Sequence, residues 1–319
     1  MTHAIRQYEF GSAETLKYEE VPAPVPGRGQ VRIQVAAAGV HLVDTVIREG
    51  KPGPFPRPEL PMTPGREVAG TVDVLGEDVD TGWLGKKVVA HLGMASGGYA
   101  EAAIADAESL HAVPDGMPAD HAVAMIGTGR TTFAVLDVAQ IRSDDIVLVS
   151  AAAGGMGNLL VQAAKNAGAV VVALAGGPDK VRLVESLGAD VVIDYRQDGW
   201  AERVQPVTVV LDGVGGEPGR QALERLAPGG RIVLYGASAG GEFTQISTGD
   251  LFRLGITASV AIGPRIAQRG LRYFETAALA SAGRGEVTPV TQSFPLAKAA
   301  EAHAALESRG TVGKVVLVP

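Results

Sequence analysis

One segment limits the fold more than any other. The apolar run Ile146–Ala151 is followed at once by a glycine-rich turn and then by the helix-forming stretch Asn158–Ala167. The turn has the spacing A-x-G-x-x-G, in which Gly154 lets the backbone approach a pyrophosphate and Gly157 lets helix and strand pack closely. The N-terminus of the helix supplies free N–H groups and a positive dipole end for the anion. We therefore predict a dinucleotide site, with a ligand-free tight turn as the alternative, at Ala153, Gly154, Gly155, Met156 and Gly157.

Strand-forming and helix-forming stretches alternate through the segment 122–263. Strands are expected at Ile146–Ala151, Val170–Ala175, Val191–Ile193, Thr208–Leu211 and Arg231–Tyr235, and helices at Ala119–Ala139, Asn158–Ala167, Asp179–Leu187 and Glu217–Leu226. Strands that are almost continuous in Val, Ile and Leu are typical of a parallel sheet covered on both faces. The pattern predicts an α/β fold with a doubly wound parallel sheet of the Rossmann type.

The flanking segments differ from this pattern. The first is rich in short strands, among them Val31–Ala37, Val68–Val74 and Lys87–Ala90. Prolines and glycines in Gly50–Gly65 exclude a helix or a central strand, so we expect a rigid loop that roofs a pocket or simply connects two strands. The last segment should contain helices Ile266–Ala282 and Ala297–Ser308 and strand Lys314–Val318. We predict a nucleotide-binding domain, 122–263, inserted into a β-rich domain formed by 1–121 and 264–319.

The end of the second predicted strand indicates which nicotinamide cofactor is bound. NAD enzymes place Asp or Glu there to bind the ribose 2′-hydroxyl, whereas this chain has Ala175 followed by Gly176 and Gly177. Lys180 and Tyr195 come later in the chain, and their ammonium and hydroxyl groups would suit a 2′-phosphate. These features favour NADPH; a solvated helix lysine and a strand-end tyrosine are the alternative interpretation of the two residues.

Two later glycine turns follow apolar strands. Parallel sheets bind ligands at the carboxyl ends of their strands, which is where these turns fall. Loop closure without a ligand contact is an equally good explanation for Gly215 and Gly216. The cofactor-contact residues predicted in these turns are Val214, Tyr235, Gly236 and Ser238.

Composition excludes several classes of function. The 319 residues contain no cysteine, which excludes disulfides, a thiolate nucleophile and a cysteine-ligated metal. The formal net charge of −7 argues against nucleic acid as the main partner. The N-terminus, MTHAIRQYEF, has no apolar core of a signal peptide, and no uninterrupted apolar run approaches the ~20 residues of a membrane span. A cytoplasmic protein without a membrane partner is expected.

Several short segments together resemble a known family. They are Ala38–Asp44 (AGVHLVD), Pro64–Gly70 (PGREVAG), Ala151–Gly157, Leu187–Tyr195 and Gly313–Val316. In order and spacing the chain is similar to the zeta-crystallin-like quinone oxidoreductase branch of the medium-chain dehydrogenase/reductase superfamily, whose members are relatives of alcohol dehydrogenase that lack zinc. The resemblance implies a GroES-like substrate domain beside the Rossmann domain. It also implies a homodimer that pairs through the last strand of the nucleotide sheet, here Gly255–Ile262.

Departures from the wider superfamily bear on the metal and on the substrate. Zinc-dependent members have cysteine and histidine where this chain has His41 and Arg66, so no metal site is expected. His41 and Glu67 alone would make a poor metal site. Quinone reductases usually have asparagine at the position of His41 and often tyrosine at that of Val46, which leaves open a substrate other than a simple quinone.

The resemblance implies an NADPH-dependent reductase that transfers hydride to a quinone. His41 is the predicted donor to the substrate oxygen, with a backbone-satisfied histidine as the alternative, and Thr131 should position the cofactor unless it only caps a helix. Asp44 is expected to cap a short helix, Tyr99 to line the pocket or pack the domain, and Lys314 to approach the cofactor.

Two other functions are compatible with these residues. One is reduction of an activated carbon–carbon double bond in an enone or an enoyl thioester, which needs the same placement of cofactor and donor. The other belongs to a different class: a cofactor-binding regulator or RNA-binding protein with little turnover, against which the acidic charge and the intact cofactor turn argue.

Overall fold

The computed structural model describes residues 1–52, 56–93 and 96–319. It contains two compact units, which we call the first domain (1–127 with 290–319) and the second domain (128–289). These bounds differ from those expected, because 122–127 belong to the first domain and 264–289 to the second. Helix α9 (Leu271–Gly283) explains the larger difference, since it packs against α3 (Arg130–Ala139) within the second domain.

The second domain is a doubly wound α/β unit, as predicted. Its six strands all run parallel in the order β10-β9-β8-β11-β12-β13. Counted from the first strand of the domain this order is 3-2-1-4-5-6, that of Rossmann dinucleotide-binding folds. The strands are β8 (Ile146–Val149), β9 (Val170–Ala175), β10 (Val191–Asp194), β11 (Val207–Asp212), β12 (Leu226–Leu234) and β13 (Thr257–Val260).

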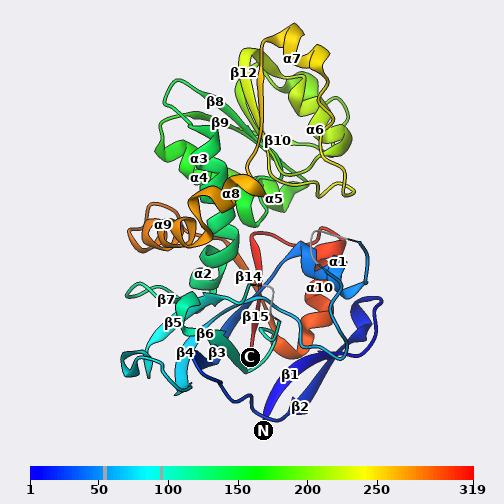
Figure 1. Ribbon diagram of the computed structural model, residues 1–319. Helices are drawn as coiled ribbons and strands as arrows, with labels where there is room; N and C mark the ends of the chain where they lie inside the picture. Colours follow the sequence, from blue (N-terminus) through cyan, green and yellow to red (C-terminus); the bar gives the residue numbers. More distant parts are fainter. Residues whose placement is uncertain (53–55, 94–95) are drawn as a thin grey trace. The chain divides into compact units, whose positions relative to one another are not determined.

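Alternation along the strands builds a core on each face of this sheet. In β8, Val147 and Val149 join one buried cluster while Leu148 joins the other, as the two-residue period of a strand requires. Helices cover both faces (Figure 1, green to yellow). They are α3, α4 (Gly155–Asn166), α5 (Pro178–Ser186), α6 (Gly216–Leu223) and α7 (Thr248–Leu254), while α8 (Pro264–Arg269) contacts α9, which packs on α3.

Several element boundaries differ from the predicted ones. Helix α4 starts at Gly155, three residues earlier than expected, because the glycine turn itself forms its first turn. Strand β12 begins at Leu226, inside the predicted helix. The single helix expected at Ile266–Ala282 is two helices, because Gly270 adopts φ +80°, which ends α8 before α9 begins.

The first domain is built on antiparallel strands. A seven-stranded sheet has the order β14-β15-β3-β4-β5-β7, with β6 also paired to β3, and β1 and β2 form a separate hairpin. The strands are β1 (Thr2–Gln7), β2 (Leu16–Val21), β3 (Gln30–Val40), β4 (Glu67–Leu75), β5 (Lys87–His91), β6 (Ala102–Asp106), β7 (Leu110–Ala112), β14 (Thr291–Pro295) and β15 (Lys314–Val318). Helices α1 (Leu42–Arg48), α2 (Ala119–Ala124) and α10 (Ala299–Glu307) complete the domain.

One helical stretch in the described residues, Ala119–Ala139, is long and apolar enough to cross a membrane by length and composition alone. Inside the protein 67% of its most apolar window is buried, which is the behaviour of a core helix. Its middle, Met125–Gly129, is a π-helical turn, a feature often found at functional sites.

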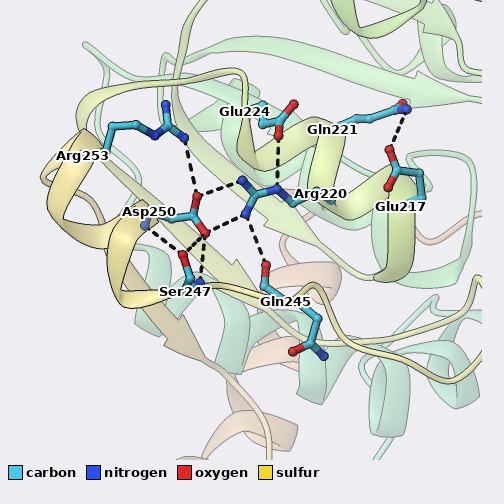
Figure 2. A network of polar contacts seen from close by, with 8 residues as sticks. All are labelled: Glu217, Arg220, Gln221, Glu224, Gln245, Ser247, Asp250 and Arg253. Atoms are coloured by element: carbon cyan, nitrogen blue, oxygen red, sulfur yellow. Dashed lines mark hydrogen bonds and ion pairs between the residues drawn. The ribbon is translucent and has the colours of Figure 1, made fainter.

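A surface ion network joins two helices at the rim of the second domain. Arg220 on α6 donates to both carboxylate oxygens of Asp250 on α7, at 2.7 and 2.8 Å (Figure 2). Asp250 also accepts from the N–H and hydroxyl of Ser247 at 2.9 and 2.7 Å, which caps α7. Arg220 and Ser247 lower the pKa of Asp250 through these hydrogen bonds. The network therefore fixes α7 to α6 through the partly exposed Arg220 and the buried Asp250.

Candidate active site

His41 lies where strand β3 ends and helix α1 begins. Its backbone N–H donates to Asp44 Oδ2 at 2.8 Å, and the Asp44 N–H donates to the His41 carbonyl oxygen at 3.0 Å. These two bonds start the helix at His41, so Asp44 is a capping residue, as predicted. The imidazole is thereby held at the strand end with 21% of the side chain exposed.

The His41 ring contacts a fully buried carboxylate. Glu67 Oε2 lies 2.9 Å from His41 Nε2, and Glu67 Oε1 lies 2.5 Å from Lys314 Nζ. The side chains of Glu67 and Lys314 are 0% and 4% exposed. Lys314 thus forms a buried ion pair with Glu67, and its expected approach to the cofactor stays a prediction.

The sheet register brings these three distant residues together. Strand β15 pairs antiparallel with β3 so that Val315 lies opposite Val40, which places Lys314 beside the end of β3. Strand β4 pairs with β3 so that Val68 lies opposite Ala38, which places Glu67 beside Gly39. His41, Glu67 and Lys314 therefore meet because three strands start or end at the same edge.

Two glycines leave room for the Glu67 carboxylate. A Cβ atom at Gly39 would lie 2.0 Å from Glu67 Oε1, and one at Gly127 would lie 2.1 Å from Oε2. Gly127 belongs to the π-helical turn Met125–Gly129. Any other residue at either position would displace the carboxylate, so the cavity is shaped for an ionised Glu67 with its two cationic neighbours.

Glu67 stays ionised although it is buried. Burial by itself raises the pKa of a carboxyl group, but the charges of His41 and Lys314 more than offset it, and the net pKa of Glu67 is lowered. A carboxylate on Nε2 holds the proton of the neutral imidazole on that nitrogen. The other ring nitrogen, Nδ1, is then an acceptor, so His41 donates a proton outward only in its doubly protonated form.

A second buried network adjoins the first at Asp44. Tyr99 donates its hydroxyl hydrogen to Asp44 Oδ2 at 2.9 Å, and its oxygen lies 3.2 Å from His303 Nε2. Arg48 Nη1 lies 3.4 Å from His303 Nδ1, and Arg48 Nη2 lies 2.5 Å from Glu307 Oε1. Burial and the nearby Asp44 raise the pKa of Tyr99 well above its ordinary value. Tyr99 is thus a neutral donor that packs the domain core, one of the two roles expected for it.

The proline-rich loop lines a pocket in the first domain. The pocket encloses about 140 Å³ beside Asp44 and Arg66, and Arg57 and Pro58 come from the predicted rigid loop. Residues 53–55 of that loop lie outside the described residues. Arg66, whose side chain is 11% exposed, has its Nε 3.8 Å from Asp44 Oδ1. The loop therefore contributes cationic and apolar surface to a pocket that is also lined by Asp44 of α1.

The predicted phosphate-binding turn has the shape that a dinucleotide requires. Gly154 is the N-cap of α4, and a Cβ there would meet only the Ala151 carbonyl oxygen, at 3.2 Å. A Cβ at Gly157 would lie 2.2 Å from that same oxygen. Gly157 thus lets the helix pack on the strand, while Gly154 leaves its open side to a ligand. Among the other members of the turn, Ala153 is buried, and Gly155 and Met156 are half-buried in the first turn of α4.

The ends of β9 and β10 form the next part of this site. A Cβ at Gly176 would lie 2.6 Å from the Tyr195 hydroxyl, and one at Gly177 would lie 2.7 Å from an Arg196 nitrogen. Lys180 is half-buried in α5, which starts at the same edge. Tyr195 and Arg196 therefore lie directly beside Gly176 and Gly177. These glycines follow the end of the second strand, where an NAD enzyme has its Asp or Glu. Arg196 was not among the residues predicted, although it directly follows one that was.

The two later glycine turns are held by internal hydrogen bonds. The buried Asp212 carboxylate accepts from the N–H groups of Val214 and Gly215 at 2.9 and 3.2 Å. The Tyr235 ring covers Gly213, and its hydroxyl lies 3.5 Å from the Ser150 carbonyl oxygen. Gly236 and Ser238 follow at the end of β12, where Ser238 N–H donates to Gly213 O at 3.2 Å. Internal hydrogen bonds are therefore sufficient to explain the conformation of these turns. Their contact with a cofactor stays a prediction.

Thr131 lies in the first turn of α3, within the second domain. The N-cap of this helix is Gly129, so Thr131 does not cap it, which removes the alternative expected for this residue. The neighbouring Thr132 is buried and donates to the Thr128 carbonyl oxygen at 2.9 Å. The part of Thr131 in positioning the cofactor stays a prediction.

Comparison with known proteins gives the same family along the whole chain. Residues 27–115 match the alcohol dehydrogenase GroES-like domain, and residues 187–317 match a domain described as zinc-binding dehydrogenase. The quinone oxidoreductase of Pseudomonas aeruginosa is 32% identical over 100% of both chains, and a 2-haloacrylate reductase from Burkholderia is 31% identical over 98% of this chain and 97% of its own. A mycobacterial protein solved in complex with NADPH is 34% identical over 100% of both chains, with a TM-score of 0.86.

The chain belongs to the quinone oxidoreductase branch of the medium-chain dehydrogenase/reductase superfamily. Membership makes it an oxidoreductase and confirms the predicted fold, a Rossmann domain with a β-rich GroES-like domain.

The description of one matched domain as zinc-binding calls for a test of the residues present. The chain has no cysteine. Among the residues that the structure describes, no three His, Asp or Glu side chains are grouped as metal ligands. The buried carboxylate of Glu67 faces the positive charge of Lys314 in this chain, where a metal site would need further ligands.

The motif-based prediction missed how the charged residues pair. Glu67 and Lys314 were singled out separately, and their contact was not foreseen. His303, which no sequence motif singles out, is fully buried. A charged residue that opens an otherwise apolar strand, as Lys314 does before Val315–Val318, is the signal that would have found the pair, since such residues are rarely buried alone.

Proposed function

We propose that the chain is an NADPH-dependent oxidoreductase that reduces a quinone or a related α,β-unsaturated carbonyl compound without zinc. One observation carries the cofactor assignment: the open glycine turn lies at the carboxyl end of β8, and the neighbouring strand β9 is followed by Gly176 and Gly177 instead of an Asp or Glu, with the Tyr195 hydroxyl beside Gly176. A hydroxyl and cations suit a 2′-phosphate, which an Asp or Glu would repel. The similarity to a protein solved with NADPH supports the same cofactor.

NADPH would supply the hydride, and this chain's residues supply binding, orientation and a proton. The residues proposed to hold the cofactor are Ala153, Gly154, Gly155, Met156, Gly157, Gly176, Lys180, Tyr195, Val214, Tyr235, Gly236 and Ser238. Thr131 is proposed to position its nicotinamide end. His41, doubly protonated over the Glu67 carboxylate, is proposed to give the Nδ1 proton to the reduced substrate. A neutral His41 then regains its proton from solvent.

Two measurements test this proposal. Binding affinities of NADPH and NADH, with wild type and with Tyr195→Phe and Lys180→Met, should show a preference for NADPH that both variants reduce. Oxidation of the cofactor should then be followed against a panel of quinones and a panel of enones. Equal affinity for both cofactors would contradict the 2′-phosphate assignment, and no turnover with either panel despite tight NADPH binding would contradict the substrate assignment.

Reduction of an activated carbon–carbon double bond is the second candidate. The similarity to a 2-haloacrylate reductase favours it. So do Arg57 and Arg66 in the pocket beside Asp44, because a carboxylate-bearing acrylate needs a cation near the reacting bond. Turnover of 2-haloacrylate that exceeds quinone turnover, and that falls in Arg66→Met, would assign the chain to this activity. Faster quinone turnover, unchanged in Arg66→Met, would retain the first candidate.

We also propose that the chain forms a homodimer through β13. This strand is the last in the sheet order, and three of its four residues are exposed. A bare apolar edge strand invites pairing, and Phe252 on the adjacent α7 is 93% exposed. Light scattering should give twice the chain mass for wild type and a lower mass for Val260→Lys. A monomeric wild type would contradict the proposal.

A further inference from the structure

The Glu67 carboxylate has two cationic neighbours at its two oxygens. Lys314 lies at Oε1 and His41 at Oε2. With a neutral His41 the buried charges of Lys314 and Glu67 cancel. A second proton on His41 leaves the group with one net positive charge inside the domain. Glu67 and Lys314 therefore act on the His41 proton in opposite directions.

We propose that Glu67 and Lys314 are opposing positioning residues for the proton-donating form of His41. Glu67 holds one proton on Nε2, so the transferable proton must sit on Nδ1, the nitrogen that faces away from the carboxylate. Glu67 stabilises that doubly protonated, singly charged ring, and Lys314 limits its population. The inference rests on the proposed role of His41, and it assigns a function to two buried residues that do not touch the substrate.

Burial makes this opposition effective. Both Glu67 and Lys314 are nearly inaccessible to water, and charges in such an environment interact more strongly than at the surface. The glycine cavity at Gly39 and Gly127 leaves the carboxylate no other position. A Coulomb interaction over about 4–6 Å at an effective dielectric constant of about 20 amounts to on the order of two to three pH units.

Other charged groups face the same site and stay constant in the test. His91 lies opposite Glu67 in the register of β4 with β5. Asp44 and Arg66 flank the cluster from α1 and from the residue before β4, and Tyr99 packs on the far side of Asp44. Asp120 on α2 accepts a hydrogen bond from the Thr291 hydroxyl group, with Thr291 Oγ1 2.6 Å from Asp120 Oδ2. The variants below change none of these groups, so shifts of opposite sign would be due to the two substituted charges.

Opposite shifts of the pH–rate profile are the first expected result. If the reaction needs doubly protonated His41, kcat falls as pH rises. Lys314→Met removes the opposing cation and should move the midpoint of that fall up by about two pH units. Glu67→Gln removes the stabilising carboxylate and should move it down by a similar amount. Lys314→Arg retains the charge and should restore the wild-type midpoint. Two shifts in the same direction, or none, would overturn the proposal.

A stability control separates this role from mere structural support. Asp145→Asn breaks a buried ion pair with Arg231 in the second domain, where Asp145 Oδ2 lies 2.6 Å from Arg231 Nη2. We expect it to lower the melting temperature without moving the midpoint of the pH profile. A shift in this variant equal to that in Lys314→Met would mean that loss of stability alone explains the result.

The second readout does not depend on turnover. Nitrogen-15 spectra of labelled histidine, with the His41 signals assigned by their loss in His41→Asn, report which ring nitrogen carries a proton. Wild type should show the Nε2–H form at high pH, and Glu67→Gln should lose that preference. The titration midpoint of the ring should shift upward in Lys314→Met. A ring without tautomer preference in wild type would overturn the inference. The expected spectra without turnover would uphold the positioning and contradict only the proposed function.

A double variant covers the case in which a single variant does not fold. Lys314→Met with Glu67→Gln leaves no unpaired buried charge. Its ring titration should lie between those of the two single variants, close to wild type. A midpoint outside that interval would overturn the proposed opposition.

Discussion

The two domains build their sites in different ways. In the first domain the site consists of charged side chains that are buried together, with Glu67, Lys314 and His41 in one cluster and Arg48 and His303 in the next. In the second domain it consists mainly of backbone, because glycines leave N–H groups and open surface at the ends of strands. The second domain also has ion pairs, such as those of Arg231 with Asp145 and of Arg220 with Asp250 (Figure 2), but its glycine turns do not contain them.

This difference matches two tasks: the second domain's turn suits binding of the cofactor, and the first domain's side chains suit proton transfer. A backbone turn at a helix N-terminus suits an anionic cofactor because it provides donors without a titratable group. Proton transfer needs a side chain that titrates, and burial of that side chain requires compensating charges. The site of the first domain should therefore depend on ion pairs, whereas the glycine turn of the second should depend on them far less.

The largest expected effect is the loss of one member of the buried cluster. Lys314→Met leaves the Glu67 carboxylate buried with His41 as its remaining partner, and we expect a loss of about 3–5 kcal/mol in the free energy of unfolding. Denaturant unfolding at neutral pH measures it. A loss below about 1 kcal/mol, the range of surface pairs, would remove the contrast between the domains.

A double-mutant cycle refines this prediction. Lys314→Met combined with Glu67→Gln replaces the pair with neutral side chains of similar shape, so most of the lost stability should return. The recovery measures the coupling of the two charges. If the losses of the single variants simply add, the two residues act independently and the cluster is not a unit.

The second effect is acid sensitivity from His303. Burial lowers the pKa of His303 to about 4, and the charge of Arg48 acts in the same direction. The unfolded histidine has a pKa of about 6.5. Between these values the unfolded chain binds a proton that the folded chain does not, so stability falls as pH decreases, by about 3 kcal/mol in all.

Unfolding measured from pH 7 to 4 tests this effect. Arg48 faces His303 Nδ1 at 3.4 Å, which leaves no place for a second proton on the ring. His303→Gln should therefore flatten the loss of stability between pH 6.5 and 4.5. An unchanged slope in this variant would assign the acid sensitivity to other groups.

The third effect compares two glycines, one from each site. Gly39→Ala pushes a methyl group into the Glu67 carboxylate, and we expect a loss of about 1–3 kcal/mol, typical of overpacking. Gly154→Ala meets only one carbonyl oxygen, so its stability should hardly change while its affinity for NADPH falls. Melting curves with and without NADPH distinguish the two. Equal destabilisation by both substitutions would show that the turn is packed as tightly as the cluster.

The same contrast explains what could be predicted from sequence. The residues of the turn Gly154–Gly157 are contiguous, and each glycine is required by a known geometry, either close approach of a phosphate or close helix–strand packing. Both the Rossmann sheet and its phosphate-binding turn can therefore be predicted from the pattern. The cluster joins residues 41, 67 and 314, and only the register of β15 and β4 on β3 brings them together. The break at Gly270 was missed because a single glycine within an apolar helical pattern does not specify its own φ.

The smallest expected effect is that of a surface ion pair in the second domain. Lys165 on α4 lies 2.8 Å from both carboxylate oxygens of Asp190, and about a third of each side chain is exposed. Asp190 also accepts from the Val171 N–H at 2.7 Å, so it retains a partner when the lysine is removed. Lys165→Met should therefore change the free energy of unfolding by less than about 1 kcal/mol, and high salt should reduce that difference further. A loss as large as that of Lys314→Met would mean that exposure does not govern the strength of ion pairs in this protein, and the contrast between its two domains would need another cause.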